Sequence, residues 1–491
     1  MSNFRATRTA PPPRRIGRYL LLALLACYLG SAAYQARKPL PDGVGATHPL
    51  RHASNVALLA DVTYVGVDGR SRSDQQVFDE VLRLVGQARR LVVVDMFLFN
   101  DFAGTDAAPP LRPLSAQLTH ALVERKAKMP GLQVLLITDP INTLYGGMAS
   151  AHLDKLRAAG VEVVVTDLAR LRAPNPAWSG AWQLCCRWAG NDDRHGWLPS
   201  PFGAGKTTLR SYLALLNLNA NHRKTLVVDA GEGWAALVAS ANPHDGSSAH
   251  GNVALRVEGD VALDLLESEK AVVAMSGGRW PPGLPAPPPV SPQPVGGTRV
   301  QLLTESRIRD ALLASLAAAR SGDQVDVAVF YLSHRGLVRE LVAARKRGVV
   351  LRVLLDPNRD AFGRLKNGIP NRQAALELHQ AGVPVRWCET HGEQCHAKFL
   401  LRRSEGDESE LIVGSANYTR RNLDDYNLES SLRVLAPGDA AVSVEAARYF
   451  EQAWSNGDGR RISLPYPAFE DRSQWRYWRY RFTEATGLSS F

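Results

Sequence analysis

The chain has 491 residues, of which 45% are hydrophobic and 22% charged, the composition of an ordinary globular protein with a sizeable core. This length suggests two to four domains or one large duplicated unit, at roughly 100–200 residues per domain. The formal charge of +10 favours anionic partners such as phospholipid surfaces or nucleic acid. It does not choose between them, and a basic surface without a specific partner explains it equally well.

An arginine-rich stretch precedes an uncharged apolar run from Tyr19 to Tyr34; its arginines are Arg5, Arg8, Arg14, Arg15 and Arg18. This pattern is typical of export signals, and the arginine excess favours an inside N-terminus with the rest of the chain outside the cytoplasm. The run is shorter than the roughly 20 residues of a comfortable membrane span. We therefore predict that residues 1–45 hold a single membrane anchor, with the rest of the chain extracytoplasmic (periplasmic in a bacterium). A signal cleaved near Ser31-Ala32-Ala33, giving a secreted protein, is the alternative.

Three pairs of segments repeat in the same order, which indicates a duplicated chain. Each pair joins apolar, strand-like runs or a helix that ends at glycine before a strand: 92–99 with 325–332, 134–140 with 351–357, and 156–163 with 378–385. The alternation of strands and helices predicts an α/β fold with largely parallel or mixed sheets. We expect two pseudo-symmetric halves, residues 50–280 and 298–460, that share one active site. A Pro/Gly-rich linker (281–297) joins them, and a basic-aromatic segment (461–491) follows.

The first copy contains an insertion of about forty residues, roughly 168–209, that the second copy lacks. It is rich in tryptophan (Trp178, Trp182, Trp188 and Trp197) and enters shortly before His222. Insertions of this length are more often functional lids than inert loops, so we expect it to lie over the active-site mouth. The stretch 203–207 looks like a phosphate-binding loop, but Ser200 replaces the expected first glycine and no apolar strand precedes it. We reject an ATP site there.

The five cysteines show no zinc-type spacing. Cys388 and Cys395 flank a short polar loop, and Cys185 and Cys186 are adjacent. Cys388 and Cys395 could form a disulfide if the catalytic part lies outside the cytosol. Free buried thiols are equally compatible with the sequence.

Each copy ends with the same polar motif. The first has His222 and Lys224, followed by Ser240 and Asn242; the second has His396 and Lys398, followed by Ser415 and Asn417. Residues two apart on a strand share one face, so each imidazole and ammonium should converge on one anion. The serines and asparagines should add donors to a phosphate held between the copies. Two histidines also supply a nucleophile that forms a phosphohistidine and an acid that protonates the leaving alcohol. We expect no metal and no cofactor, because the lysines can neutralise the phosphate.

These residues resemble the phospholipase D superfamily, whose signature is His-x-Lys-x4-Asp followed by Gly-Ser-x-Asn, present twice. The resemblance spans about residues 55–455 and implies a duplicated phospholipase D-like α-β-α sandwich and a covalent phosphohistidine. It adds Asp229 as the signature aspartate of the first copy, with His222 as nucleophile and His396 as general acid.

The two copies depart from this signature in different ways. The aspartate position of the second copy holds Arg403, and Ala239 replaces the first glycine of the first copy's turn. Many members place a glutamate downstream to orient a histidine; Glu429 fills that place in the second copy, and counting residues puts Ala254 at the matching place in the first. Because each copy keeps a different carboxylate, the two histidines are expected to be unequal.

Three functions compete. A phospholipid enzyme, either a phospholipase D or a transphosphatidylase of the cardiolipin synthase type, fits the anchor, the tryptophans and the basic charge. The C-terminal run 475–482 of aromatic and arginine residues suits the headgroup zone. A segment that caps the catalytic domain could have the same composition. A membrane-anchored nuclease that cuts single strands is the alternative, and an inactive binding scaffold is the third. We expect a monomer that acts at a membrane surface.

Overall fold

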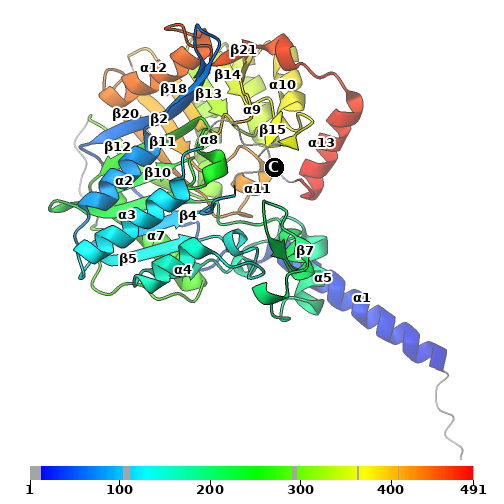
Figure 1. Cartoon of the computed structure of the whole chain (residues 1–491). Coiled ribbons are helices and arrows are strands. Elements are labelled where there is room, and N and C mark those ends of the chain that lie inside the picture. The colour runs from blue at the N-terminus through cyan, green and yellow to red at the C-terminus, as the bar shows by residue number, and fades with distance from the viewer. Residues whose placement is uncertain (1–12, 103–110, 290–295, 362–363, 407, 490–491) are drawn as a thin grey trace, which may run out of the picture.

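The computed structural model describes residues 13–102, 111–289, 296–361, 364–406 and 408–489. Arg5, Arg8 and part of the expected linker (290–295) lie outside the described residues. Two large mixed sheets form the body of the molecule (Figure 1).

The first sheet has eight strands. Its order is β3 (Ser71–Asp74), β2 (Val56–Val65), β11 (Asn252–Glu258), β10 (Gly233–Ala239), β9 (Lys224–Ala230), β4 (Leu91–Met96), β5 (Gln133–Thr138) and β6 (Glu162–Val165). Strands β4, β5 and β6 run parallel, and β9 joins β4 antiparallel.

The second sheet has nine strands. Its order is β1 (Leu50–His52), β12 (Arg299–Thr304), β20 (Ser430–Ala436), β19 (Ser409–Gly414), β18 (Lys398–Arg403), β13 (Gln324–Val329), β14 (Val350–Leu355), β17 (Val385–Cys388) and β21 (Ser463–Pro465). Seven consecutive strands of each sheet have the same order and direction, so β9 is equivalent to β18 and β4 to β13.

The central strands are buried at nearly every position, so each sheet buries both faces. The faces turned toward each other form one core with helices α7 (Val261–Met275) and α12 (Ala441–Ser455). The outer face of the first sheet packs on α2 (Val77–Gln87), α3 (Leu114–Lys128) and α4 (Ala151–Ala158). That of the second packs on α8 (Ser306–Ala318), α9 (Arg335–Lys346) and α10 (Asn371–Gln380). The expected α/β sandwich is confirmed.

Two strands of the second sheet come from outside the predicted second half, residues 298–460. Strand β1 precedes the first strand of its own half but pairs with β12 of the second sheet, and β21 of the C-terminal segment pairs with β17. The second sheet is therefore completed at both edges by segments outside residues 298–460.

Smaller elements lie around this body. They are α1 (Pro13–Arg37), α5 (Pro176–Cys185), the hairpin β7 (Leu198–Pro199)–β8 (Lys206–Thr207), α6 (Leu209–Leu215), the hairpin β15 (Asp360–Ala361)–β16 (Arg364–Leu365), α11 (Arg420–Leu423) and α13 (Gln474–Thr486). Helix α1 projects from the body beside α5, and α13 lies against the second half (Figure 1). The loop that resembled a phosphate-binding loop is the tip of the β7–β8 hairpin.

Candidate active site

The two histidines occupy equivalent places, each two residues before a central strand, β9 for His222 and β18 for His396. Each is tied to the opposite half through its backbone. The N–H of His222 donates to the carbonyl of Leu428 at 2.9 Å, and the N–H of His396 donates to that of Gly251 at 2.7 Å. Isolated β-bridges flank both contacts, Asn221 with Leu428 and Cys395 with Gly251. These reciprocal bonds bring the two motifs to one place between the sheets.

Each imidazole is also oriented by a side chain of the opposite half. Nδ1 of His222 lies 3.0 Å from the carboxylate of Glu429, and Nδ1 of His396 lies 3.2 Å from Oδ1 of Asn252. The amide nitrogen of Asn252 donates to the carbonyl of His250 at 2.9 Å, so its oxygen faces His396. Because both partners present an acceptor, both rings carry their proton on Nδ1 and leave Nε2 for a substrate.

The position equivalent to Glu429 is Asn252, and the residue-counting assignment to Ala254 is wrong. The hydroxyl of Ser415 donates to Glu429, and the N–H of Ser430 donates to Ser415 at 3.0 Å. In the first half the hydroxyl of Ser240 donates to Asn252 at 3.2 Å, and the N–H of Val253 donates to Ser240 at 3.0 Å. The turn before Asn252 is two residues shorter than the turn before Glu429, so counting overshoots.

Those same bonds correct the expected role of the serines. A hydroxyl has one proton to donate, and Ser240 and Ser415 give theirs to the residues that orient the histidines. Both side chains are fully buried. They therefore hold Asn252 and Glu429 in place and do not donate to a phosphate.

The asparagines fit their expected place better. Oδ1 of Asn242 accepts the N–H of Leu98 at 3.2 Å, which leaves its amide N–H₂ for an anion. Asn417 is 5% exposed, and its Oδ1 has no hydrogen-bond partner within the part of the chain that the structure describes.

The lysines converge as the strand geometry requires. Nζ of Lys224 donates to the carbonyl of His222 at 2.5 Å, and Nζ of Lys398 to that of His396 at 2.6 Å. Each ammonium also lies over a phenylalanine ring, Lys224 at 4.8 Å from the centroid of Phe97 and Lys398 at 5.3 Å from that of Phe330. An ammonium has three donors, so each lysine keeps donors for a phosphate.

The two phenylalanines are site residues that the sequence reasoning missed. Phe97 and Phe330 follow the equivalent strands β4 and β13, and their rings lie 4.9 Å from His222 and 5.0 Å from His396. They close the inner side of both imidazoles with apolar surface. The signal was present, since the aligned segments 92–99 and 325–332 carry them at the same place.

Asp229 lies away from this centre. Its carboxylate accepts the backbone N–H groups of Arg89, Arg90 and Leu91 at 2.8 to 3.1 Å. It is near the far end of β9, five residues beyond Lys224, which at about 3.3 Å per residue is roughly 16 Å. The expected catalytic role of Asp229 is therefore corrected to the anchoring of the β4 N-terminus. In the second half Arg403 instead pairs with Asp326 at 3.1 Å.

A buried ion-pair network holds the two halves in register beneath His222. Arg223, the residue between His222 and Lys224, is fully buried and bonds Glu305 of the second half at 2.8 Å and Glu269 at 3.3 Å. Glu305 in turn accepts the backbone N–H of Glu429 at 3.1 Å. Arg223 thus fixes the backbone that presents the partner of His222.

Burial and mutual repulsion govern protonation in the site. Burial lowers the pKa of His222 to about 4 even though Glu429 raises it. Burial and the charge of Lys398 hold the pKa of His396 well below its usual value. Burial likewise lowers the pKa of Lys224 to about 7. A cluster of this kind gains from an anion that offsets the repulsion between its cations.

Known proteins share this architecture. Residues 312–454 match the family model described as the phospholipase D-like domain of cardiolipin synthase. The fold is similar to that of phosphatidylserine synthase from Haemophilus influenzae, with a TM-score of 0.57, 9% identity, and coverage of 91% of this chain and 97% of that chain. By its sequence the second half thus carries a phospholipase D-like domain, and the whole chain shares the fold of that phosphatidylserine synthase.

Two other solved structures match less closely. Polyphosphate kinase from Porphyromonas gingivalis has a TM-score of 0.45 and 11% identity over 88% of this chain and 53% of that one. Nuc from Salmonella typhimurium, a phospholipase D family member, has a TM-score of 0.26 and 18% identity over 34% of this chain and 97% of that one. No curated protein matches the sequence.

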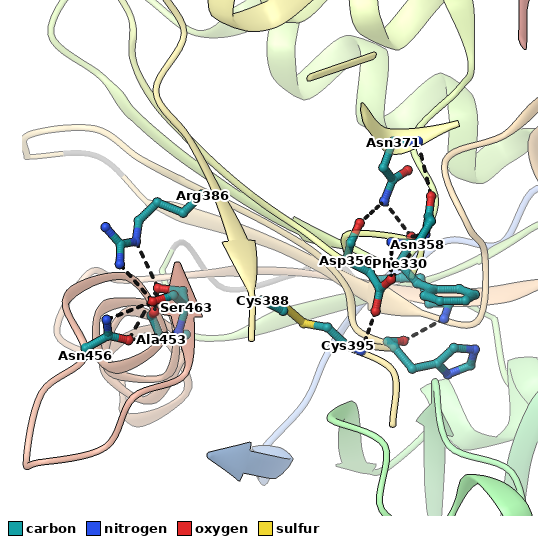
Figure 2. The surroundings of a disulfide bond; sticks show 12 residues. Phe330, Asp356, Asn358, Asn371, Arg386, Cys388, Cys395, Ala453, Asn456 and Ser463 are labelled. Atoms are coloured by element: carbon teal, nitrogen blue, oxygen red, sulfur yellow. Dashed lines mark hydrogen bonds between the residues drawn. A yellow bond between two sulfur atoms is a disulfide. The ribbon is translucent and has the colours of Figure 1, made fainter. Parts of the chain in front are cut away.

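A disulfide braces the second histidine of this phospholipase D-like site. Cys388, at the end of β17, is bonded to Cys395, which directly precedes His396 (Figure 2). The N–H of Cys395 also donates to the carboxylate of Asp356 at 2.8 Å. In the first half Asp139 accepts the N–H of Asn221 at 2.7 Å in the same way, without a disulfide. Cys185 and Cys186 form a second disulfide at the end of α5.

The N-terminal helix is joined to the tryptophan-rich insertion. Of the described helices, α1 is the one long and apolar enough to cross a membrane, over Ile16–Arg37. Its last turns pack on α5, where the hydroxyl of Ser31 donates to the carbonyl of Gly180 at 3.0 Å. A Cβ added at Gly180 would lie 2.8 Å from the backbone of Ala32. The end of α1 is therefore built into the folded domain beside the insertion.

The C-terminal helix α13 has two different faces. Tyr480 is fully buried, contacts Phe330 and Tyr331, and donates its hydroxyl to the carbonyl of Ser333 at 3.2 Å. Trp475, Trp478 and Phe482 are 61% to 77% exposed. The helix thus caps the site next to Phe330 and also presents aromatic rings outward.

Proposed function

We propose that this enzyme cleaves or exchanges the headgroups of phospholipids through a phosphohistidine at His222. The phosphodiester would lie between the two histidines, with Lys224 and Lys398 neutralising its non-bridging oxygens. Nε2 of His222 attacks phosphorus, the bond to the leaving alcohol breaks, and His396 gives its proton to the departing oxygen. His396 then takes a proton from water or from a second alcohol, whose oxygen displaces His222 from phosphorus.

The carboxylate of Glu429 supports His222 as the nucleophile. When Nε2 bonds to phosphorus, the ring keeps its Nδ1 proton and becomes positively charged. Glu429, 3.0 Å from that nitrogen and fully buried, stabilises the charge. His396 faces the neutral amide of Asn252 instead, so its protonated form is the more acidic of the two, as a proton donor requires.

An anionic substrate completes the protonation pattern. Burial is the main cause that lowers the pKa of His396, and the charges of the neighbouring cations lower it further. A bound phosphodiester places negative charge among these cations, which favours the protonated form of His396. His222 stays neutral and nucleophilic at neutral pH because its pKa lies near 4.

The docking of α1 on the insertion supports a lipid substrate. The insertion lies between β6 and β9, and β9 follows directly on the His222 motif. Because α5 of the insertion holds the end of the apolar helix α1, a membrane-bound α1 would hold the insertion close to the membrane surface. We propose that α1 is a retained anchor, since cleavage near Ala33 would remove the Ser31–Gly180 contact.

The test is a paired assay of the full chain in detergent micelles. Labelled phosphatidylglycerol and a labelled single-stranded oligonucleotide are each supplied to the parent chain, to His222→Ala and to His396→Ala. We expect turnover of the lipid by the parent chain alone. Cutting of the oligonucleotide without lipid turnover would identify a nuclease, and full activity in either histidine variant would refute a shared site.

A further inference from the structure

A cavity of about 580 Å³ lies where α1 meets the insertion. Its wall includes Lys38 just beyond α1, Arg187 of the insertion, Arg210 of α6, and Trp182 of α5. The apolar part of α1 ends at Tyr34, so a membrane-spanning α1 places this cavity at the level of the lipid headgroups.

Three cations of the wall have neutral partners. Lys38, only 6% exposed, donates to the side chain of Gln35 at 2.7 Å and the carbonyl of Ala169 at 2.6 Å. Arg187 donates to Gln183 at 3.2 Å, and Arg210 donates to the carbonyl of Arg187 at 2.7 Å. A buried ammonium with uncharged partners is costly unless an anion compensates it.

Among the described residues, no salt bridge joins a carboxylate of the wall to any of these three cations. Asp154 is engaged by Arg157 at 3.2 Å, and Asp167 by Arg170 at 3.4 Å. Asp193 is exposed. Burial, and after it the charge of Arg187, lower the pKa of Lys38 to about 8, although Asp167 raises it.

Arg210 provides the independent sign of a missing ligand. Its Nε is buried and, over the described ranges, has no hydrogen-bond acceptor. Its guanidinium lies over the ring of Trp182, 5.1 Å from the centroid. A planar guanidinium with a free N–H donor, set beside two further cations, matches the oxygens of a phosphate.

We infer that this cavity binds the phosphate of an anionic phospholipid, at a site separate from the histidine centre. Lys38 and Arg187 would neutralise the phosphate while Arg210 donates to its oxygens, and the acyl chains would extend along α1 into the bilayer. Such a lipid would hold the insertion against the membrane.

The inference rests on the proposed retention of α1 but not on the proposed lipid turnover. The full chain carrying His222→Ala, which prevents turnover, is released from nanodiscs of phosphatidylcholine and phosphatidylglycerol and examined by native mass spectrometry. We expect one retained phosphatidylglycerol. Arg187→Gln and Arg210→Gln should each lower its occupancy about tenfold, the equivalent of losing roughly 1.4 kcal/mol. Arg194→Gln, which changes an exposed cation of the same insertion that pairs with Asp192, should leave it unchanged.

Equal occupancy in the Arg187 and Arg210 variants would overturn the inference. Arg187 is exposed, so its variant decides the matter if Arg210→Gln does not fold. In a parallel arm the same chain is titrated in detergent with inorganic phosphate alone. Binding of phosphate that depends on Arg210, without any retained lipid, would assign the cavity to a free anion and also refute the lipid site.

Discussion

His222 faces a carboxylate, Glu429, whereas His396 faces a neutral amide, Asn252. The substitution Glu429→Gln therefore tests most directly which histidine is the nucleophile. This substitution keeps the shape of the side chain but removes the charge that faces Nδ1 of His222 at 3.0 Å. A carboxylate this close to a buried imidazole shifts its pKa by about 1–3 units, and each unit corresponds to about 1.4 kcal/mol. Formation of the charged phosphohistidine should therefore slow by roughly 10- to 1000-fold.

The assay is the pre-steady-state release of p-nitrophenol from bis(p-nitrophenyl) phosphate. This leaving group departs without a proton, so the burst reports attack by the nucleophile alone. Asn252→Asp is the matched variant, because it places a carboxylate 3.2 Å from Nδ1 of His396. It should leave the burst nearly unchanged but slow the release of alkyl alcohols, because a more basic His396 is a weaker acid. A burst that survives in Glu429→Gln but fails in His396→Ala would refute the assignment and make His396 the nucleophile.

Four further outcomes follow from the same geometry. Asp229→Ala should lower the free energy of unfolding by on the order of 3 kcal/mol, because three backbone N–H groups lose a charged acceptor. The burst rate of the folded enzyme should stay unchanged. Urea denaturation measures the first effect and the burst assay the second. Replacing Cys388 and Cys395 by serine removes their disulfide and should lower the free energy of unfolding by roughly 2.5 kcal/mol, the value for its short loop. Cys27→Ser, at an exposed free thiol, should leave that free energy unchanged in the same denaturation experiment. The burst rate should be lost on acidification only as the pH falls through about 4, since the nucleophile is the neutral form of His222 and its pKa is lowered to about 4; loss near pH 6.5 would contradict this. Gly180→Ala should loosen α1 from α5 at a cost of about 1–3 kcal/mol, seen as faster proteolysis after residue 30, and unchanged proteolysis would contradict the close packing.

The fold could be predicted because it depends on features that repeat along the chain. Apolar strand runs, the helices that end at glycine and the two His-x-Lys motifs each occur twice in one order. A duplicated chain with one site between its halves follows from that order. Local patterns could not show that β1 pairs with β12 or that β21 completes the second sheet, because short edge strands are defined by their partner and not by their own composition.

The sequence predicted that the two His-x-Lys motifs meet between the halves. Where its expectations for single residues differ from the structure, the differences have physical causes. The signature marked Asp229 as a site residue, but Asp229 lies five residues beyond Lys224 on an extended strand. That spacing places its side chain far from the histidines. Counting placed the counterpart of Glu429 at Ala254 instead of Asn252, because a turn can lose two residues without changing the strands it joins. Arg223 was invisible as a site residue, since nothing in the sequence shows that a charged side chain will be buried between Glu269 and Glu305.

The reciprocal arrangement explains why the site needs both halves and why the halves differ. Each histidine takes its orienting acceptor from the opposite half, so neither half alone could fix the tautomer of its own imidazole. With carboxylates at both acceptor positions, both rings would be pulled toward the charged form, and two imidazoliums would face each other beside Lys224 and Lys398. Asn252 avoids this, because an amide oxygen fixes the ring of His396 without stabilising its proton. One half thus supports a nucleophile that becomes charged, and the other supports an acid that must give its proton away.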